Sequence, residues 1–89
     1  MEFDWDPAKH DKVLRERGFS FADVVPMFSG PCLIRRDDRR DYGEARYISI
    51  GCNGTDMFTV VFTDRGHVRW IITAWPASRK ERAEWQRSR

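Results

Sequence analysis

Two groups of charged residues hold the side chains best suited to chemistry. Glu44 and Arg46 lie two residues apart in the segment GEAR, and Arg65 and Arg69 enclose the segment GHV. Cleavage of RNA through its own 2′-hydroxyl requires a base for that hydroxyl, cations for the pentavalent phosphate and a proton donor for the leaving oxygen. One carboxylate with several guanidiniums supplies the first two requirements. The spacing also fits a cross-strand salt bridge between Glu44 and Arg46 worth under ~1 kcal/mol, and spacing alone favours this plainer interpretation.

Histidine and tryptophan add two further candidates. His67 opens a predicted strand beside Arg65 and Arg69 and could serve as an acid or base, although a turn histidine without a function is the more common case. Trp75 stands at a predicted strand end before a proline and could stack on a nucleic-acid base. The chain has four tryptophans, and we expect most of them to be core or partner-facing anchors because the indole ring has a large area to bury.

Length and composition limit the class of protein. The 89 residues predict one domain, residues 1–89, with a single modest core. The net charge is only +2, but residues 1–64 hold nine Lys and Arg against twelve Asp and Glu, whereas residues 65–89 hold seven against two. Thirteen of the sixteen basic residues are arginine, whose planar fork matches phosphate or carboxylate. This skew is a hint of an anionic partner.

Several functional classes lack a signature here. There is no phosphate-cradling glycine loop, no zinc-binding spacing of Cys and His and no Gly-x-Ser-x-Gly elbow. We therefore expect no metal and no other cofactor. Cys32 and Cys52 are expected to be buried free thiols, although neighbouring strands could bring them together. No apolar run approaches a membrane span, and the acidic start MEFDWD is unlike a signal peptide, so we expect a cytoplasmic protein.

Three helices are predicted. An Asp-Pro pair opens a helix that should run to about Arg17 and stop at the following glycine. Ser20 caps a shorter helix over FADVVPMF, which its proline should make brief or kinked. Ser78 and Glu81 form a capping box for a C-terminal helix over RKERAEWQRSR.

Period-two segments after residue 31 predict four strands, near 32–37, 45–52, 57–63 and 67–75. Turns at CNGTD and TDRGH and the other short connections predict an antiparallel meander, and EFDW could add a short N-terminal strand. The fold class is therefore α+β, with a four-stranded antiparallel sheet, two N-terminal helices and one C-terminal helix. We expect the helices to cover one face, with Phe58, Val60 and Phe62 buried, and the opposite face to be open and concave.

Strand alternation predicts which charged side chains share a side of the sheet. It places Glu44 and Arg46 on one side of strand 45–52, and it groups Arg69 with Thr73 and Trp75 on one side of strand 67–75. If both strands present these residues to one groove, several guanidiniums converge near one carboxylate. The charged residues 35–42 mix both signs evenly, and we expect them to be mainly a solvated connection.

Five segments occur in an order that resembles a known family. They are FDWDPAK, RGFSFADV, DDRRDYGEARYISIG, VVFTDRG and RWIITA, and the likeness runs from residue 3 to about residue 85. On these segments the chain resembles the BrnT toxins, which are similar to RelE-type ribonucleases in fold and form the toxin of a bacterial type II toxin–antitoxin pair. The resemblance implies metal-independent RNA cleavage that arrests translation and growth. It also implies a BrnA partner whose ribbon-helix-helix part binds operator DNA, so that the complex represses its own operon.

The charge pattern and the resemblance together predict a site around Glu44. Glu44 would act as a base or as an orienting group, and three arginines would clamp the phosphate: Arg46, Arg65 and Arg69. Contacts to RNA are expected from Lys9, Trp75, Arg79 and Lys80. The positions that fit the family's motifs are Trp5, Asp6, Lys9, Glu44, Arg46, Thr63, Arg65 and Gly66.

Two segments depart from the family's pattern. Where many members have Lys-His-Gly after the first helix, this chain has ERG at residues 16–18, and where they usually have Ile-Ser-x-Arg-Lys-Ala it has ITAWPA at residues 72–77. The second departure removes two candidate phosphate contacts, for which Arg79 and Lys80 could substitute. Two alternatives therefore accompany the ribonuclease toxin: a catalytically weak member that holds its antitoxin and tunes repression, and an RNA-binding domain without a toxin role.

Overall fold

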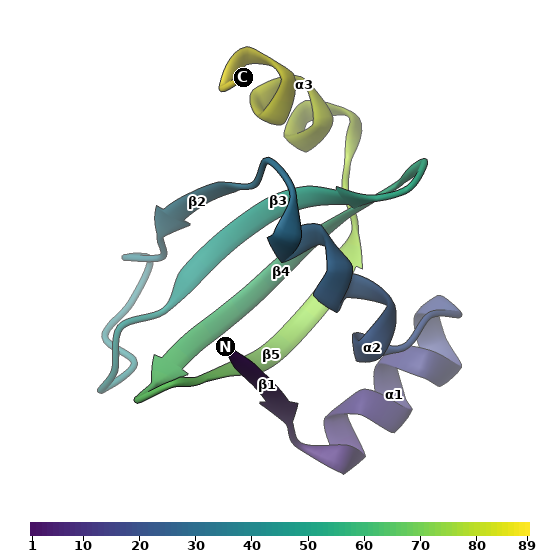
Figure 1. Ribbon diagram of the computed structural model, residues 1–89. Helices are drawn as coiled ribbons and strands as arrows, with labels where there is room; N and C mark the ends of the chain where they lie inside the picture. Colours follow the sequence, from purple (N-terminus) through teal and green to yellow (C-terminus); the bar gives the residue numbers. More distant parts are fainter.

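A five-stranded sheet organises the chain (Figure 1), and the computed structural model describes all of residues 1–89. Its strands are β1 (Glu2–Trp5), β2 (Leu33–Arg36), β3 (Tyr47–Asn53), β4 (Asp56–Arg65) and β5 (Val68–Pro76), in the spatial order β1-β5-β4-β3-β2. Strands β2 to β5 form the predicted antiparallel meander. Two glycines make its tight turns possible, because Gly54 and Gly66 have φ of 64° and 61°, a left-handed conformation that other residues seldom adopt.

The N-terminal strand changes the predicted sheet. Strand β1 pairs in parallel with β5, from Glu2 opposite Val68 to Trp5 opposite Ile71. The sheet therefore has five strands and is mixed, whereas the sequence predicted a four-stranded antiparallel sheet with only a possible further strand. A four-residue strand carries no local signal of its partner or direction, and a parallel neighbour requires a long connection. Here residues 6–67 form that connection.

Capping residues define the helices. Helix α1 (Pro7–Arg17) begins where the Asp6 carboxylate accepts a hydrogen bond from the backbone of Ala8, and Gly18 ends it in a left-handed conformation. Capping boxes at Ser20 and Ser78 open α2 (Phe21–Val24) and α3 (Arg79–Arg87). The predicted second helix is brief as expected, because its proline opens a 3₁₀ turn, η1 (Val25–Ser29), that follows α2 directly. None of these helices is long and apolar enough to cross a membrane.

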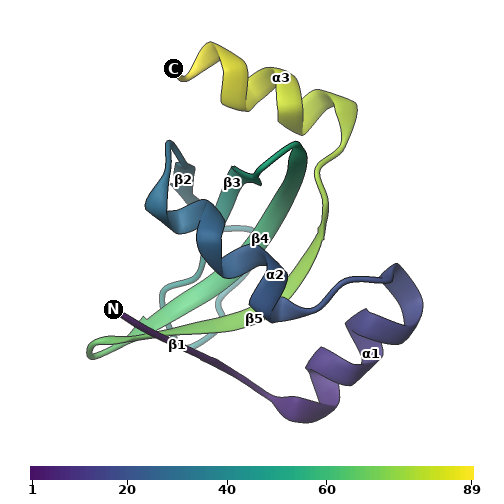
Figure 2. The same ribbon diagram turned by 45° about the vertical axis from the view of Figure 1, so that its right-hand side comes forward.

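Hydrophobic side chains form a core on each face of the sheet. The larger core joins α1, α2 and η1 to β4 and β5, and it contains Val13, Phe21, Val24, Met27, Phe58, Val60, Ile71 and Ala74. The smaller core lies on the opposite face, where Trp85 of α3 packs with Ile50 and Ala77. Helix α3 stands apart from α1 and α2 in both views (Figures 1 and 2). The expectation of one covered and one open face is therefore wrong at the end that α3 covers, while Phe58, Val60 and Phe62 are buried as predicted.

The two cysteines lie on opposite faces of the sheet. Cys32 packs against the larger core and Cys52 against the smaller one, and both are free. Both side chains are half-buried. The prediction that the two thiols are free is therefore confirmed, and the prediction that they are buried is wrong. Burial raises the pKa of the Cys32 thiol to about 11, which keeps it in the unreactive protonated form at neutral pH.

An irregularity in β5 determines which of its side chains share a face. Phe62 of β4 pairs with Ile71, whereas its neighbour Val61 pairs with Thr73, so Ile72 is an extra residue in β5. Side chains directly opposite one another in an antiparallel pair share a face. The extra residue reverses which of the odd-numbered side chains of β5 point to each face, so Arg69 and Ile71 lie on one face and Thr73 and Trp75 on the other. The predicted grouping of Arg69 with Thr73 and Trp75 is therefore wrong.

Replacing Phe21 should test the larger core. Phe21 is 0 % exposed, and Phe21→Ala should lower the free energy of unfolding by about 3–5 kcal/mol through lost burial and the cavity left behind. The matched control is Leu14→Ala on α1, where the side chain is 45 % exposed and the change should stay within about 0.5 kcal/mol. Urea unfolding measures both, and equal losses would contradict the assignment of the core.

Candidate functional site

One cleft collects most of the charged side chains that the sequence singles out. It lies beside β5 and the start of α1 and has a volume of about 210 Å³. Its lining consists of Asp6, Lys9, Glu44, Arg46, Arg65, Trp70, Ile71 and Ile72. Four predicted site residues from three separate parts of the chain thus come together: Lys9, Glu44, Arg46 and Arg65.

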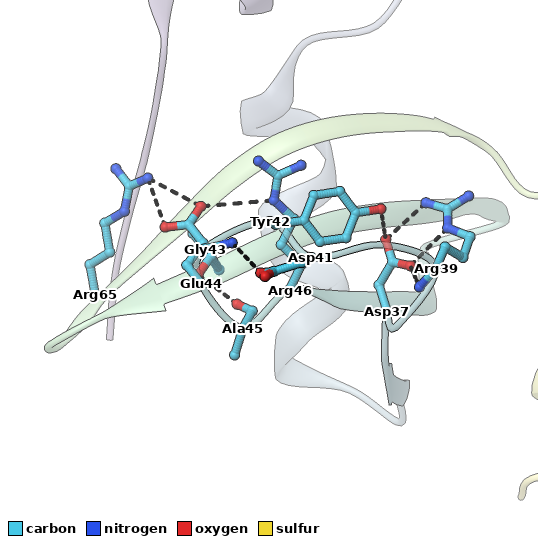
Figure 3. A network of polar contacts seen from close by, with 10 residues as sticks. Asp37, Arg39, Asp41, Tyr42, Gly43, Glu44, Ala45, Arg46 and Arg65 are labelled. Carbon is cyan, nitrogen blue, oxygen red and sulfur yellow. Dashed lines mark hydrogen bonds and ion pairs between the residues drawn. The ribbon is translucent and has the colours of Figure 1, made fainter.

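Glu44 lies between the two arginines of the cleft (Figure 3). The Arg65 Nη2 donates to both carboxylate oxygens of Glu44, at 3.2 and 3.4 Å, and the Arg46 Nε lies 3.8 Å from the Glu44 Oε2. The carboxylate offsets the repulsion that two neighbouring guanidiniums would otherwise feel. No other hydrogen bond from the side chain of Arg46 or Arg65 occurs within the protein, so several of their N–H groups remain free to bind an anion.

Glu44 and Arg46 lie in a loop and not in a strand. Strand β3 begins only at Tyr47, so the predicted alternation along strand 45–52 does not explain why these side chains meet. The loop is fixed instead from β4, where the buried Thr63 hydroxyl donates to the carbonyl of Ala45 at 2.7 Å. Because Ala45 lies between the two functional residues, this bond holds both of them beside β4.

Each arginine of the cleft lies against an aromatic ring. The guanidinium carbon of Arg65 is 5.0 Å from the Trp70 ring centroid, and that of Arg46 is 4.1 Å from the Tyr42 ring centroid. Both distances are within the range of cation–π attraction. Sequence reasoning missed Trp70 and named Trp75 instead. The missed signal is cross-strand position, because Trp70 pairs with Thr63 and so lies on the same face as Arg65, two residues further along β4.

The segment between β2 and β3 is an ordered loop built around Asp37. This carboxylate is 4 % exposed and accepts hydrogen bonds from the Arg39 Nε at 2.7 Å, the Arg39 Nη2 at 2.9 Å and the Tyr42 hydroxyl at 3.1 Å. The backbone N–H of Asp37 donates to the carbonyl of Arg46 at 2.8 Å and so closes the loop. Six of the eight residues 35–42 are exposed, so the prediction of a mainly solvated connection is confirmed for most of the segment, and Asp37 is its buried exception.

The parallel strand β1 brings α1 to the cleft. Trp5, the last residue of β1, lies opposite Ile71 of β5, and α1 begins two residues later. Asp6 caps this helix and also lines the cleft, and Lys9 adds an ammonium one turn further on. A lysine near the start of a helix gains nothing from the helix dipole, so its position here is better explained by the cleft than by helix stability.

Arg69 lies on the other face of the sheet from the cleft. It pairs across the strands with Asp64, to which it donates two hydrogen bonds at 2.8 and 3.0 Å. Its guanidinium carbon is also 4.1 Å from the Phe62 ring centroid. The expectation that Arg65 and Arg69 converge on one groove is therefore wrong, because they lie on either side of a turn and their strand positions face opposite ways. Arg69 therefore packs against aromatic rings at the edge of the larger core.

Four other predicted site residues lie away from the cleft lining. The Trp75 Nε1 donates to the Glu81 carboxylate at 3.1 and 3.3 Å, which ties β5 to α3. Arg79 and Lys80 are exposed in the first turn of α3. The His67 side chain is 83 % exposed in the turn between β4 and β5, with its Nε2 3.9 Å from the Glu2 carboxylate. A role for any of these four in the cleft chemistry would require the RNA itself to reach them.

The cleft holds three cations and two carboxylates, and one of the carboxylates, Asp6, also caps α1. Lys9, Arg46 and Arg65 supply positive charge, and Glu44, which lies between the two arginines, supplies an acceptor for a proton. The structure contains no group of three or more His, Cys, Asp or Glu side chains that could hold a metal ion. Such a cleft suits a phosphodiester, whose two free oxygens match the forks of two guanidiniums.

Fold and cleft together define a small α+β domain with a cationic cleft assembled from distant parts of the chain. Comparison with the sequence models of protein families matches residues 5–81 to BrnT, described as the ribonuclease toxin of a type II toxin–antitoxin system. The chain belongs to the BrnT family, and the resemblance seen in its sequence is confirmed. Membership in a type II system implies an antitoxin partner. No curated protein matches the chain.

Acid titration should test the anchor at Asp37. The hydrogen bonds from Arg39 lower the pKa of Asp37 from its ordinary value of 3.8 to about 2, so the folded state favours the charged form. This stabilisation is fully present above about pH 4 and is lost as the pH falls towards 2. Asp37→Asn should therefore be less stable than the wild type at pH 7, and the difference in Tm should shrink between pH 4 and pH 2.

The matched control for this titration is Asp38→Asn, since Asp38 is an exposed carboxylate in the same loop. Its Tm should follow that of the wild type throughout. A deficit of Asp37→Asn that stays constant from pH 7 to pH 2 would contradict the anchor.

Proposed function

We propose that the cleft binds RNA and cleaves it through the RNA's own 2′-hydroxyl, without a metal ion. The observation that carries this proposal is that the Glu44 carboxylate lies between the guanidiniums of Arg46 and Arg65, in a cleft that Lys9 also lines. The family's description as a ribonuclease toxin supports the substrate class. The plainer interpretation, a surface salt bridge, accounts for Glu44 and one arginine but not for the second arginine and the lysine in the same cleft.

The reaction assigns one step to each group. Glu44 removes the proton of the 2′-hydroxyl, whose oxygen then attacks the adjacent phosphorus. Arg46 and Arg65 stabilise the negative charge that develops on the pentavalent phosphate. The bond to the 5′-oxygen breaks, and Lys9, the remaining proton-bearing side chain of the cleft, donates a proton to this leaving oxygen. The products are a 2′,3′-cyclic phosphate and a free 5′-hydroxyl.

The biological setting of the proposal is bacterial growth control. The substrate would be cellular RNA in the cytoplasm, and its cleavage would arrest translation and growth. A BrnA-type antitoxin with a ribbon-helix-helix part would neutralise the toxin, and operator DNA would be bound only through that antitoxin. The RelE-type likeness of the fold remains a prediction from the sequence resemblance.

A second candidate function is a catalytically weak binding module that holds an antitoxin and tunes repression. The observation in its favour is Trp75, which occupies a position where many members are basic and bonds Glu81 of α3. The tryptophan thus serves packing where the family's pattern would place a phosphate contact. Against this, the cleft keeps Lys9, Arg46 and Arg65 without needing that contact.

Cleavage of RNA in EDTA tests the first function. The wild type should cut RNA and leave 2′,3′-cyclic phosphate ends, and Glu44→Gln or Arg65→Ala should slow cleavage by about 10²–10³-fold, the usual effect of removing one transition-state group. Arg15→Ala is the matched control, because Arg15 is exposed on α1 with no bonded partner, and it should cut at the wild-type rate. Equal rates for all variants would remove the proposed site.

Expression in cells separates the two candidate functions. An active toxin should stop growth when expressed alone, Glu44→Gln should not, and expression of a neighbouring antitoxin gene should restore growth. A binding module should be harmless alone yet should still form a complex with the antitoxin. Harmless wild-type protein that co-purifies with the antitoxin would therefore favour the second function over the first.

A further inference from the structure

We propose that Tyr42 is a positioning residue of the cleft, whose ring holds the Arg46 guanidinium beside Glu44 and is itself held by Asp37. This inference rests on the proposed function, since the reaction it serves is the cleavage proposed for the cleft. It concerns residues that do not line the cleft, because neither Tyr42 nor Asp37 contributes to its walls. Figure 3 shows the continuous path of contacts from Asp37 through Tyr42 and Arg46 to Glu44.

The first step is that Arg46 lacks the hydrogen bonds that fix Arg65. Arg65 donates twice to Glu44, but the Arg46 Nε is 3.8 Å from the nearest Glu44 oxygen, beyond hydrogen-bond distance. This Nε is also buried without a hydrogen-bond partner. The contact that remains is the Tyr42 ring, 4.1 Å from the guanidinium carbon. The orientation of Arg46 therefore depends on the ring and on the charge of Glu44.

The second step is that the Tyr42 ring is fixed from its far end. Its hydroxyl donates to the Asp37 Oδ2 at 3.1 Å, and the same carboxylate is held by two side-chain hydrogen bonds from Arg39. Asp37 also bonds through its backbone to the carbonyl of Arg46. One buried carboxylate thus fixes the ring and the backbone of the arginine that the ring supports.

The third step is the benefit of a supported arginine. A free arginine side chain must lose rotational freedom when it binds a phosphate, whereas a guanidinium already stacked on a ring has lost much of it before the substrate arrives. The N–H groups on its two Nη atoms remain unpaired and available, while the Nε is buried. Small errors in placing a catalytic group can cost up to about 10²-fold in rate, so a loop that fixes Arg46 in advance has a direct effect on catalysis.

Two substitutions distinguish the contribution of the Tyr42 ring from that of its hydrogen bond to Asp37. Tyr42→Leu removes the ring, and we expect cleavage to fall by about tenfold to a hundredfold, mainly in kcat because Arg46 keeps its charge. Tyr42→Phe keeps the ring and loses only the bond to Asp37, so we expect a loss below about threefold and rescue of most activity relative to Tyr42→Leu. Urea unfolding confirms that each variant is folded before its rate is compared.

A double-mutant cycle distinguishes positioning from direct contact with RNA. If Tyr42 acts through Arg46, then Tyr42→Leu should have no further effect in an Arg46→Ala background. If the ring instead stacks on an RNA base, Tyr42→Leu should lower the rate and the RNA affinity by the same factor in either background. That second result would overturn the inference while leaving the proposed function intact.

NMR of the ¹⁵N-labelled protein tests the stack without any reliance on activity. The Arg46 Nε–H resonance, assigned by its loss in Arg46→Ala, should be shifted upfield by the ring current of Tyr42. The shift should persist in Tyr42→Phe and disappear in Tyr42→Leu. An unchanged resonance in Tyr42→Leu would overturn the inference. Wild-type protein that shows the shift but does not cleave RNA would overturn the proposed function alone.

Discussion

Like charges can gather in a small cleft only when an opposite charge lies among them, and Glu44 provides it. Two guanidiniums and the Glu44 carboxylate leave one positive charge in excess, and Lys9 and Asp6 add one charge of each sign to the cleft lining. Partial exposure keeps the cost of bringing these charges together low, because water still screens them. The other features of the fold determine how the three cations and the carboxylate are brought within reach of one another.

Four separate devices position the members of this group. A buried hydroxyl on β4 fixes the loop that carries Glu44, a parallel strand delivers the start of α1 with Lys9, and the turn after β4 places Arg65 above Trp70. The fourth device is the anchored loop around Asp37, which supports Arg46 through Tyr42. None of these devices involves adjacent residues of the sequence, and all of them act through the sheet or its connecting loops. The cleft is a property of the tertiary structure.

The sequence predicted the local features well and the long-range features poorly. Caps and turn residues act on their immediate neighbours, so Asp6, Ser20, Ser78 and Gly54 located the elements correctly. The pairing of β1 with β5 joins residues more than sixty positions apart, and no local pattern records it. The extra residue Ile72 has no sequence signature either, yet it separates Arg69 from Thr73 and Trp75, which a regular strand would have placed together. Glu44, Arg46, Arg65 and Lys9 were predicted through family motifs, whereas Trp70 and Tyr42 required the structure.

The position of β1 also has a consequence for the order in which the protein can be assembled. The cleft takes residues from Asp6 to Ile72, and the strand that brings α1 into place pairs with one of the last strands to be made. During synthesis β1 therefore has no strand to pair with until β5 has been made. Contacts of such wide sequence separation form late in folding. The complete cleft therefore cannot form on a growing chain before β5 has been made, because only then does α1 reach its place beside the sheet.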